Sequence, residues 1–208
     1  MIKSALLYIT VSVMVVLIIF YNPSKEIYLT SMGNVKDSEV LEVKEIIESS
    51  YENYNVTILP SIDVISDSKV KGLDRYHSTK MFTSLEKMFS ERDGKVVVLT
   101  DVDICADVAG YGKNWGVFGA SKVFGKFSIV STHRMKRNVN DLLKKTVVHE
   151  LGHSFGLPHC TSEHNCLMNC KKRDGEPIEN SSAIYHINDY FCESCVNKLK
   201  YSSNFSKP

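Results

Sequence analysis

The sequence predicts a single α/β (α+β) domain built on a twisted mixed sheet, and three observations point to it. Residues 27–31, 37–51 and 56–59 follow one another as strand, amphipathic helix and strand, an order that makes the two strands parallel neighbours joined by a crossover helix. Residues 95–100 (KVVVLT) form an uninterrupted apolar run, which is typical of a central strand buried on both faces. A chain of 208 residues is also long enough for one domain with its own core.

The first half of the domain alternates strands and helices. Residues 27–31 (IYLTS) have the β-branched and aromatic content of a strand, and residues 56–59 form a second, shorter one. Apolar side chains at helical spacing predict that residues 37–51 pack on the sheet as a helix. Residues 74–90 carry a second helical face, and His77 near its start is expected to be a surface or capping residue rather than a metal ligand.

The second half adds more strands and a longer helix. Residues 101–113 are expected to form a loop, because two glycines lie near the end of this stretch. Residues 115–120 and 127–132 are predicted as two further strands. Asn140 is the expected N-cap of a helix over residues 140–153.

The composition is that of an ordinary globular domain. There are 25 Lys and Arg residues against 24 Asp and Glu residues, so the net charge is only +1. This balance gives no basis for a nucleic-acid partner. The short basic run at residues 171–173 (KKR) is interpreted as part of a solvated loop.

An uncharged apolar run at residues 5–21 precedes the domain. As a helix it would be about 25 Å long, at the short end of what spans a bilayer. A cleaved signal peptide would have a shorter apolar core and a small-residue cleavage site, whereas this run leads into the sequence YNP. We therefore expect residues 1–22 to be a single-pass membrane anchor and residues 23–208 to be the domain. Lys3 lies before the run, so the positive-inside rule favours a domain outside the cytoplasm.

The strongest chemical signal is the sequence HELGHSFGLPH at residues 149–159. His149 and His153 lie one helical turn apart on one face, so both imidazoles can bind a single ion. Gly156 can take a positive φ and turn the chain, which allows His159 to supply a third nitrogen. Three protein ligands on a tetrahedral ion leave one position open, as in a catalytic zinc site.

Glu150 belongs to the same helical turn as the histidines but is not needed as a ligand. Its carboxylate can instead hold and deprotonate a zinc-activated water. A purely structural metal site has no use for such a residue. The motif therefore predicts metal-dependent hydrolysis with Glu150 as the general base.

Further residues give the chain a family resemblance. The motif continues as HExxHxxGxxHC and is followed by another cysteine, a methionine and a CxxC pair, an order that resembles the archaemetzincins among the metzincin zinc metallopeptidases. Residues 99–103 (LTDVD) and 114–120 (NWGVFGA) are also similar to that family. The resemblance thus covers most of the chain after about residue 27. It implies a metzincin-like catalytic domain that acts on peptides or proteins.

The resemblance also assigns roles to two segments around the cleft. Residues 115–120 would form the edge of the sheet above the active site, where an extended peptide can pair with unpaired N–H and C=O groups. An edge strand covered by a loop is the alternative. Met168 would lie beneath the zinc site as an apolar support and not as a ligand. Tyr185 and His186 follow this methionine, but the spacing selects neither as an oxyanion donor.

In the family, four matching cysteines hold a second zinc, which here implies Cys160, Cys166, Cys192 and Cys195. Four thiolates close the coordination sphere of a tetrahedral ion, so this second zinc would be structural. Two disulfides or buried thiols are the alternative. The gaps between these cysteines are longer than in the family pattern, and Cys170 lies near enough to replace one of the ligands. Cys105 is expected to be a small apolar residue.

Together these features predict a membrane-anchored zinc metallopeptidase with two zinc ions per chain, one catalytic and one structural. The alternative is a membrane-anchored zinc-binding module with little or no proteolytic turnover. The presence of Glu150 favours the enzyme.

Overall fold

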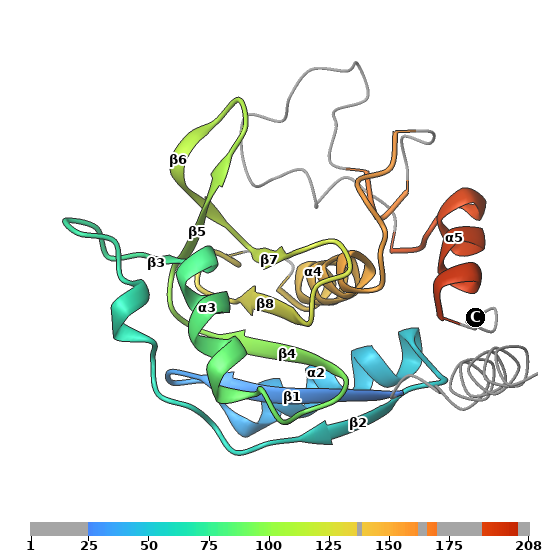
Figure 1. The fold of residues 1–208 in the computed structure, drawn as a ribbon, viewed down its shortest axis with the longest axis horizontal. Helices are drawn as coiled ribbons and strands as arrows, with labels where there is room; N and C mark the ends of the chain where they lie inside the picture. Colours follow the sequence, from blue (N-terminus) through green and yellow to red (C-terminus); the bar gives the residue numbers. More distant parts are fainter. Residues whose placement is uncertain (1–24, 137–138, 162–165, 170–188, 204–208) are drawn as a thin grey trace, which may run out of the picture.

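The computed structural model of the chain describes residues 25–136, 139–161, 166–169 and 189–203. Its strands are β1 Glu26–Met32, β2 Asn55–Ile58, β3 Tyr76–His77, β4 Lys95–Thr100, β5 Ile104–Val108, β6 Gly112–Val117, β7 Gly119–Ser121 and β8 Phe127–Ser131. Its helices are α2 Asp37–Ser50, the short 3₁₀ helix η1 Ser66–Ser68, α3 Ser78–Met88, α4 Val139–Ser154 and α5 Glu193–Ser203. A five-stranded sheet in the order β2-β1-β4-β8-β7 forms the body of the domain, and a three-stranded sheet in the order β3-β5-β6 extends from it (Figure 1).

The large sheet is mixed, as the sequence predicts. β1 pairs in parallel with β2 and with β4, and β4 pairs in parallel with β8. Only β7 runs antiparallel to its neighbour β8. The β1–α2–β2 unit is therefore confirmed, and β7 is the edge strand next to β8.

Helices cover both faces of this sheet, with α2 and α4 on one face and α3 on the other (Figure 1). The central strand β4 shows why both faces must be covered. Val97 and Leu99 belong to the core cluster that includes α2 and α4, whereas Val96 and Val98 belong to the cluster that includes α3. An apolar run with this alternation is buried on both sides, which confirms the interpretation of KVVVLT as a central strand.

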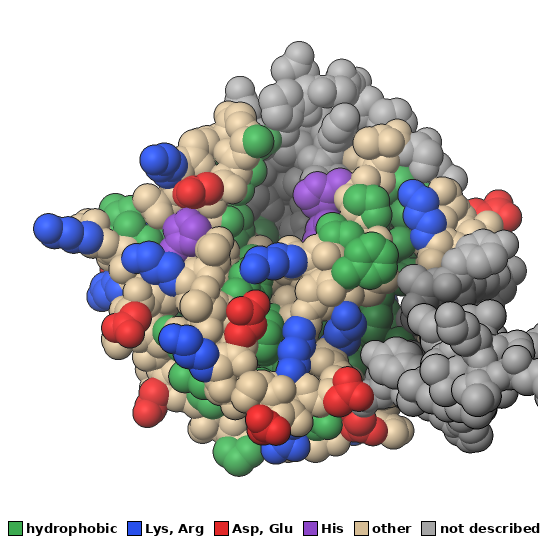
Figure 2. Space-filling model, in the orientation of Figure 1, with side chains coloured by type: hydrophobic (Ala, Val, Ile, Leu, Met, Phe, Trp, Pro, Cys, Tyr) green, Lys and Arg blue, Asp and Glu red, His purple; other side chains and the backbone are tan. Residues whose placement is uncertain are grey.

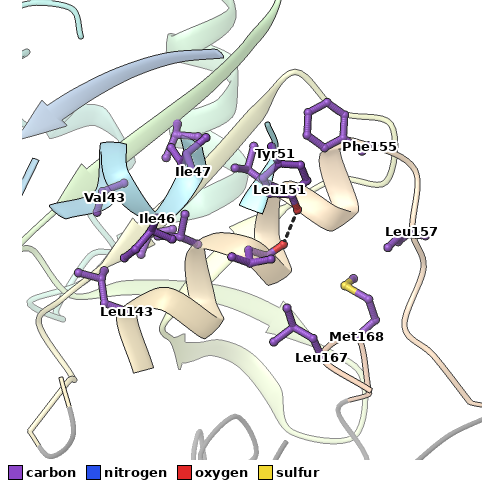
Figure 3. Close-up of a cluster of buried hydrophobic side chains, with 14 of the residues drawn as sticks. Val43, Ile46, Ile47, Tyr51, Leu143, Leu151, Phe155, Leu157, Leu167 and Met168 are labelled. Carbon is purple, nitrogen blue, oxygen red and sulfur yellow. Dashed lines mark hydrogen bonds between the residues drawn. The ribbon is translucent and has the colours of Figure 1, made fainter. Parts of the chain in front are cut away.

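The two helices on the first face are joined by packing and by one buried hydrogen bond (Figure 3). Ile46 and Ile47 of α2 belong to the same buried cluster as Leu143 of α4. Tyr51, which follows α2 and is fully buried, donates its hydroxyl to Val148 O at 2.9 Å. A bond of this kind contributes about 1 kcal/mol, and it fixes the helix that carries the histidines relative to α2.

The prediction of a loop over residues 101–113 is wrong, because this stretch contains β5. The strand is short, contains Asp107, and has an irregular register between Ala106 and Val108, so its sequence shows no clear alternation. It pairs with β6 on one side and with the two-residue strand β3 on the other. Sheet pairing with distant segments, and not local pattern, makes this segment a strand.

The single strand expected over residues 115–120 is also corrected. The chain forms β6 up to Val117 and then β7 from Gly119, and the two belong to different sheets. The residue between them, Phe118, is buried in the core cluster with α4, while Val117 packs against the cluster with α3. Consecutive strand residues ordinarily face opposite cores, so this alternation does not mark the break. The break arises because β6 pairs with β5 whereas β7 pairs with β8.

Two expectations about helix starts have different outcomes. His77 is confirmed as a capping residue, because it precedes α3 and its Nδ1 accepts from Thr79 N at 3.3 Å. The expected N-cap of α4, Asn140, is the second residue of the helix, which starts at Val139, and a difference of one residue is usual at helix ends. The N-cap assignment therefore stays a prediction.

Residues 1–22, the expected membrane anchor, lie outside the described residues. So do the basic run at residues 171–173 and the residues Cys170, Tyr185 and His186. Within the part of the chain that the structure describes, no helix is both long enough and apolar enough to cross a bilayer.

Candidate active site and metal centres

Helix α4 brings two of the three histidines into the body of the protein. It packs against β8 and β7, and its last three turns are buried on nearly all sides. The helix ends at Ser154, and Gly156 then adopts φ +98°, a conformation that favours glycine. The predicted turn after the helix is thus confirmed, and the chain returns through Leu157 toward His159.

The structure brings His149, His153 and His159 together. Their ring centroids are 4.7, 4.8 and 5.5 Å apart, and one nitrogen of each ring lies within 4.8 Å of the other two. His149 and His153 are buried, with 5% and 7% of their surface exposed, whereas His159 is exposed. Three imidazole nitrogens that converge in this way, with one ring open to solvent, fit a zinc site with an accessible position.

Two backbone carbonyls orient the buried imidazoles. His149 Nδ1 donates to Leu167 O at 2.9 Å, and His153 Nδ1 donates to Leu157 O at 2.7 Å. A proton on Nδ1 leaves the lone pair on Nε2, which is the form that binds a metal. Each ring is therefore held in its ligating tautomer and orientation by a main-chain group that the motif itself does not reveal.

Burial keeps these histidines neutral. It lowers the pKa of His149 to about 3, with help from the neighbouring His153 and His159 rings, and lowers the pKa of His153 to about 4. Burial also lowers the pKa of His159. Because a metal ion competes with protons for the imidazole nitrogen, rings that stay neutral well below pH 7 are available to bind a metal ion.

Glu150 lies beside the histidines in an apolar environment. It is 7% exposed, and burial raises the pKa of its carboxyl to about 8. Its side chain lies against the main chain of β7, so closely that a Cβ on Gly119 would come within 2.5 Å of Glu150 Cγ and 2.6 Å of Oε1. Only a residue without a side chain at position 119 leaves room for this carboxylate, and no local pattern distinguishes that glycine from the others.

Serine hydroxyl groups connect helix α4 to strands β7 and β8 by hydrogen bonds. Ser128 Oγ, on β8, donates to Glu150 O at 3.1 Å and lies 2.9 Å from Ser154 Oγ. Ser121 Oγ, on β7, lies 3.1 Å from Ser154 Oγ and donates to Phe127 O. This buried network fixes the distance between the helix that carries Glu150 and the edge strand β7. It joins residues that are far apart in sequence, so no local pattern predicts it.

Met168 lies beneath the histidine-bearing helix, as the resemblance implies. Its side chain is fully buried, and its sulfur would be 2.8 Å from a Cβ placed on Gly152, the glycine between the two histidines of α4. Met168 O accepts from Cys160 N at 2.8 Å. The methionine therefore packs directly on the helix backbone and supports the site as an apolar contact (Figure 3).

The structure also brings together the sulfurs of Cys160, Cys166, Cys192 and Cys195, all of them buried. The Cys160–Cys192 and Cys166–Cys195 sulfur pairs are each 3.7 Å apart. A disulfide would need about 2.0 Å, whereas a tetrahedral zinc with bonds of ~2.3 Å sets its sulfurs roughly 3.8 Å apart. The separations in these two pairs thus match a closed zinc site and not disulfides, and the donor set fits the predicted second zinc.

The thiols of this cluster shift one another's pKa. The Cys195 thiol and the backbone N–H of Cys192 lower the pKa of Cys166, whereas the contact with Cys166 raises the pKa of Cys195 and burial raises the pKa of Cys192. Among the described residues, Cys105 lies outside the cluster. It is buried in β5, burial raises its pKa, and it behaves as the small apolar residue that was expected.

The two ligand clusters are neighbours along the chain and in space. His159 and Cys160 are consecutive, and Cys166 directly precedes Leu167, whose carbonyl orients His149. Histidine side chains are exposed at a hollow on one face of the molecule (Figure 2). The arrangement thus combines an open three-nitrogen site, a buried carboxylate and a closed four-sulfur site.

Comparisons with known proteins agree with this geometry. The model of peptidase family M54 matches residues 68–201. The archaemetzincin of Methanopyrus kandleri is 37% identical over 140 residues, which cover 64% of this chain and 69% of that protein. The archaemetzincin of Thermococcus kodakarensis is 29% identical over 188 residues, or 83% of this chain and 94% of that protein. The crystal structure of the Methanopyrus kandleri archaemetzincin matches the fold with a TM-score of 0.68 at 22% identity, over 88% of this chain and 97% of that one.

Proposed function

Because the chain belongs to peptidase family M54 and is a zinc metallopeptidase of the archaemetzincin kind, we propose that it hydrolyses peptide bonds at the three-histidine site with Glu150 as the general base. The observation that carries this proposal is a buried carboxylate beside three converging imidazoles, one of which is exposed. A structural metal site would need neither the carboxylate nor the exposed ligand.

Three residues would hold the catalytic zinc through nitrogen, namely His149, His153 and His159. When bound, zinc supplies a Lewis acid that polarises the scissile carbonyl and lowers the pKa of water toward neutrality. Cys160, Cys166, Cys192 and Cys195 would hold the structural zinc, which makes two ions per chain. If Cys170 replaces one of these ligands, the count remains two.

Glu150 would move the proton. Its carboxylate accepts the proton of the attacking water at one oxygen and then returns it to the leaving amine, as general base and general acid in turn. Burial favours this role because a carboxylate in an apolar environment binds a proton more strongly than one in water. Gly119 and the serine network keep the carboxylate against β7, close to where the substrate backbone would lie.

β7 would bind the substrate main chain. One side of β7 pairs with β8, and β7 is the last strand in the order of the five-stranded sheet. An extended peptide can add to such an edge through backbone hydrogen bonds, which position it without reading its sequence. The strand is only three residues long, so main-chain pairing would fix the peptide near the scissile bond.

The test of this function is Glu150→Gln. The amide matches the carboxylate in shape but cannot accept the water proton, so kcat/KM on a cleaved library peptide should fall by ~10²–10⁴-fold while zinc content and Tm stay unchanged. His153→Ala should differ by losing one zinc together with activity. A Glu150→Gln protein that keeps its zinc and the wild-type rate would falsify the assignment of the base. A zinc-loaded wild type that cleaves no library peptide would favour the zinc-binding module instead.

We further propose that residues 5–21 anchor the domain to a membrane, on the grounds of their uncharged apolar sequence. The full chain should then resist extraction from membranes by carbonate and high salt, and removal of residues 1–22 should release it. A mature chain that begins near residue 27 would show cleavage instead.

A further inference from the structure

Phe124 is the most exposed large hydrophobic side chain among the described residues, with 72% of its surface accessible. It lies in the turn between β7 and β8 and adopts φ +60°. This left-handed conformation is uncommon for a residue with a Cβ and is disfavoured for a bulky one. The unfavourable backbone conformation is not offset by burial of the ring, so a role beyond folding is indicated.

Main-chain contacts, and not the ring, hold this turn in place. Phe124 N donates to His153 O at 3.0 Å, and Gly125 N donates to Lys122 O at 2.7 Å. Lys95 Nζ donates to Gly125 O at 2.9 Å and to Ser154 O at 2.7 Å. Any residue at position 124 could make the first bond, and asparagine or glycine would do so with less strain.

The ring lies against the zinc-binding motif. A Cβ on Gly156, in the turn between His153 and His159, would be only 2.2 Å from Phe124 Cε1. The ring thus rests on the backbone of Gly156 and leaves most of its surface open. Lys122, on the same turn, places its amine 5.4 Å from the centre of the Phe82 ring of α3.

We propose that Phe124 is one wall of an apolar subsite that takes an aliphatic or aromatic side chain of the peptide substrate. This inference rests on the proposed function. A peptide paired with β7 passes the point where the strand ends at Ser121, and Phe124 follows within three residues. Figure 2 shows hydrophobic side chains exposed beside the histidines at the hollow on this face. The Phe124 ring rests on Gly156, between His153 and His159, so its apolar area borders the histidine site and is buried when a substrate side chain covers it.

The two variants that test this subsite are Phe124→Asn and Phe124→Leu. Asparagine tolerates the left-handed backbone but removes the apolar surface, whereas leucine keeps the surface and removes the ring. Cleavage profiles on a peptide library are compared with those of the wild type, together with zinc content and Tm. Met88→Asn is the matched control, because Met88 is also an exposed hydrophobic residue, 55% accessible, at the end of α3.

The wild type is expected to prefer large apolar residues at one position near the cleaved bond. Phe124→Asn should reduce that preference by about tenfold, with two zincs retained and Tm unchanged or higher. Phe124→Leu should keep the preference, and Met88→Asn should have the wild-type profile. A Phe124→Asn protein with an unaltered profile and a lower Tm would show that the ring only covers Gly156. That result would overturn this inference and leave the proposed function intact. A wild type that cleaves no peptide would overturn the inference together with the proposed function.

Discussion

The histidine site and the cysteine site meet at the consecutive residues His159 and Cys160, yet their surroundings differ. The four cysteine sulfurs are all buried. The histidine site has three ligand nitrogens, one exposed ring, and a buried carboxylate with a raised pKa beside it. Among the described residues, the histidine site has three ligands instead of four, and a carboxylate lies beside them. The difference teaches that the number of ligands and the neighbouring acid group, and not the presence of a ligand set alone, distinguish a reactive centre from a structural one.

The histidine site also depends on the cysteine site, whereas the cysteine site does not depend on the histidine site. The carbonyl that orients His149 belongs to Leu167, in the segment between Cys166 and Met168. That segment is fastened to Cys160 by a backbone hydrogen bond of 2.8 Å. Damage to the cysteine site should therefore reach the histidine site, whereas loss of the catalytic group should leave the cysteine site intact.

The largest expected effect comes from Cys192→Ser combined with Cys195→Ser. The binding energy of a structural zinc contributes directly to folding, so the zinc count should fall from two to one or fewer, and Tm should fall by at least ~10 °C. Activity should fall too, because the carbonyl of Leu167 is no longer held. Zinc analysis and calorimetry measure both effects.

Cys105→Ser is the matched control for this double change, since Cys105 is buried but lies outside the cluster. It should keep two zincs and lose only the small stability that a buried thiol contributes. If the double variant keeps two zincs, Cys170 or another group is a ligand and the four-sulfur assignment is wrong.

An intermediate effect is expected from Gly119→Ala. The added methyl group would overlap the side chain of Glu150, so the carboxylate must move while zinc binding and the fold are preserved. We expect kcat/KM to fall by roughly 10²-fold, mainly through kcat. In a double-mutant cycle with Glu150→Asp, whose shorter side chain makes room for the methyl group, the combined loss should be smaller than the product of the single losses. Wild-type kcat in Gly119→Ala would show that this contact does not position the base.

The smallest expected effect is a pH dependence of stability that only the histidine site should show. It concerns protein treated with a chelator until one zinc per chain remains. Burial raises the pKa of Glu150 from 4.5 to about 8, so the folded state binds the extra proton and stability falls as pH rises through this window. His149 and His153 have pKa values lowered from 6.5 to about 3 and about 4, so they oppose this trend below pH 6.5, where unfolding takes up their protons.

Above pH 6.5 only the carboxylate contributes, and Tm should fall by about 5 °C toward pH 8. Glu150→Gln should abolish this alkaline fall and keep the loss of stability at acidic pH. Thermal scans of both proteins between pH 4 and pH 9 provide the measurement. An identical alkaline fall in the two proteins would show that another group is responsible.

The parts of the fold that local pattern predicts are those whose side chains face a core. The apolar run of β4 and the helical spacing in α2 have this property, and both elements lie where the sequence places them. β5 does not, because its short bulged strand is specified by pairing with β3 and β6. The break at Phe118 is hidden for a similar reason, because the strands on its two sides pair with different partners, β5 and β8.

The candidate site likewise contains some groups that local sequence pattern predicts and others that it does not. The spacing of the motif suffices to bring His149, His153 and His159 to one point, because a helical turn and a glycine turn are local features. The groups that orient them are main-chain carbonyls, which every residue carries and no sequence pattern marks. Gly119 cannot be recognised from the sequence for another reason. It matters because it has no side chain where Glu150 packs, and this contact joins segments that are distant in the sequence.

The adjacency of His159 and Cys160 finally sets an order of assembly. The carbonyl that orients His149 belongs to Leu167, which directly follows Cys166, and Met168 O accepts from Cys160 N. We therefore expect the cysteine site to form before the ring of His149 is oriented during folding. On this expectation the three-histidine site is the last part of the domain to be completed.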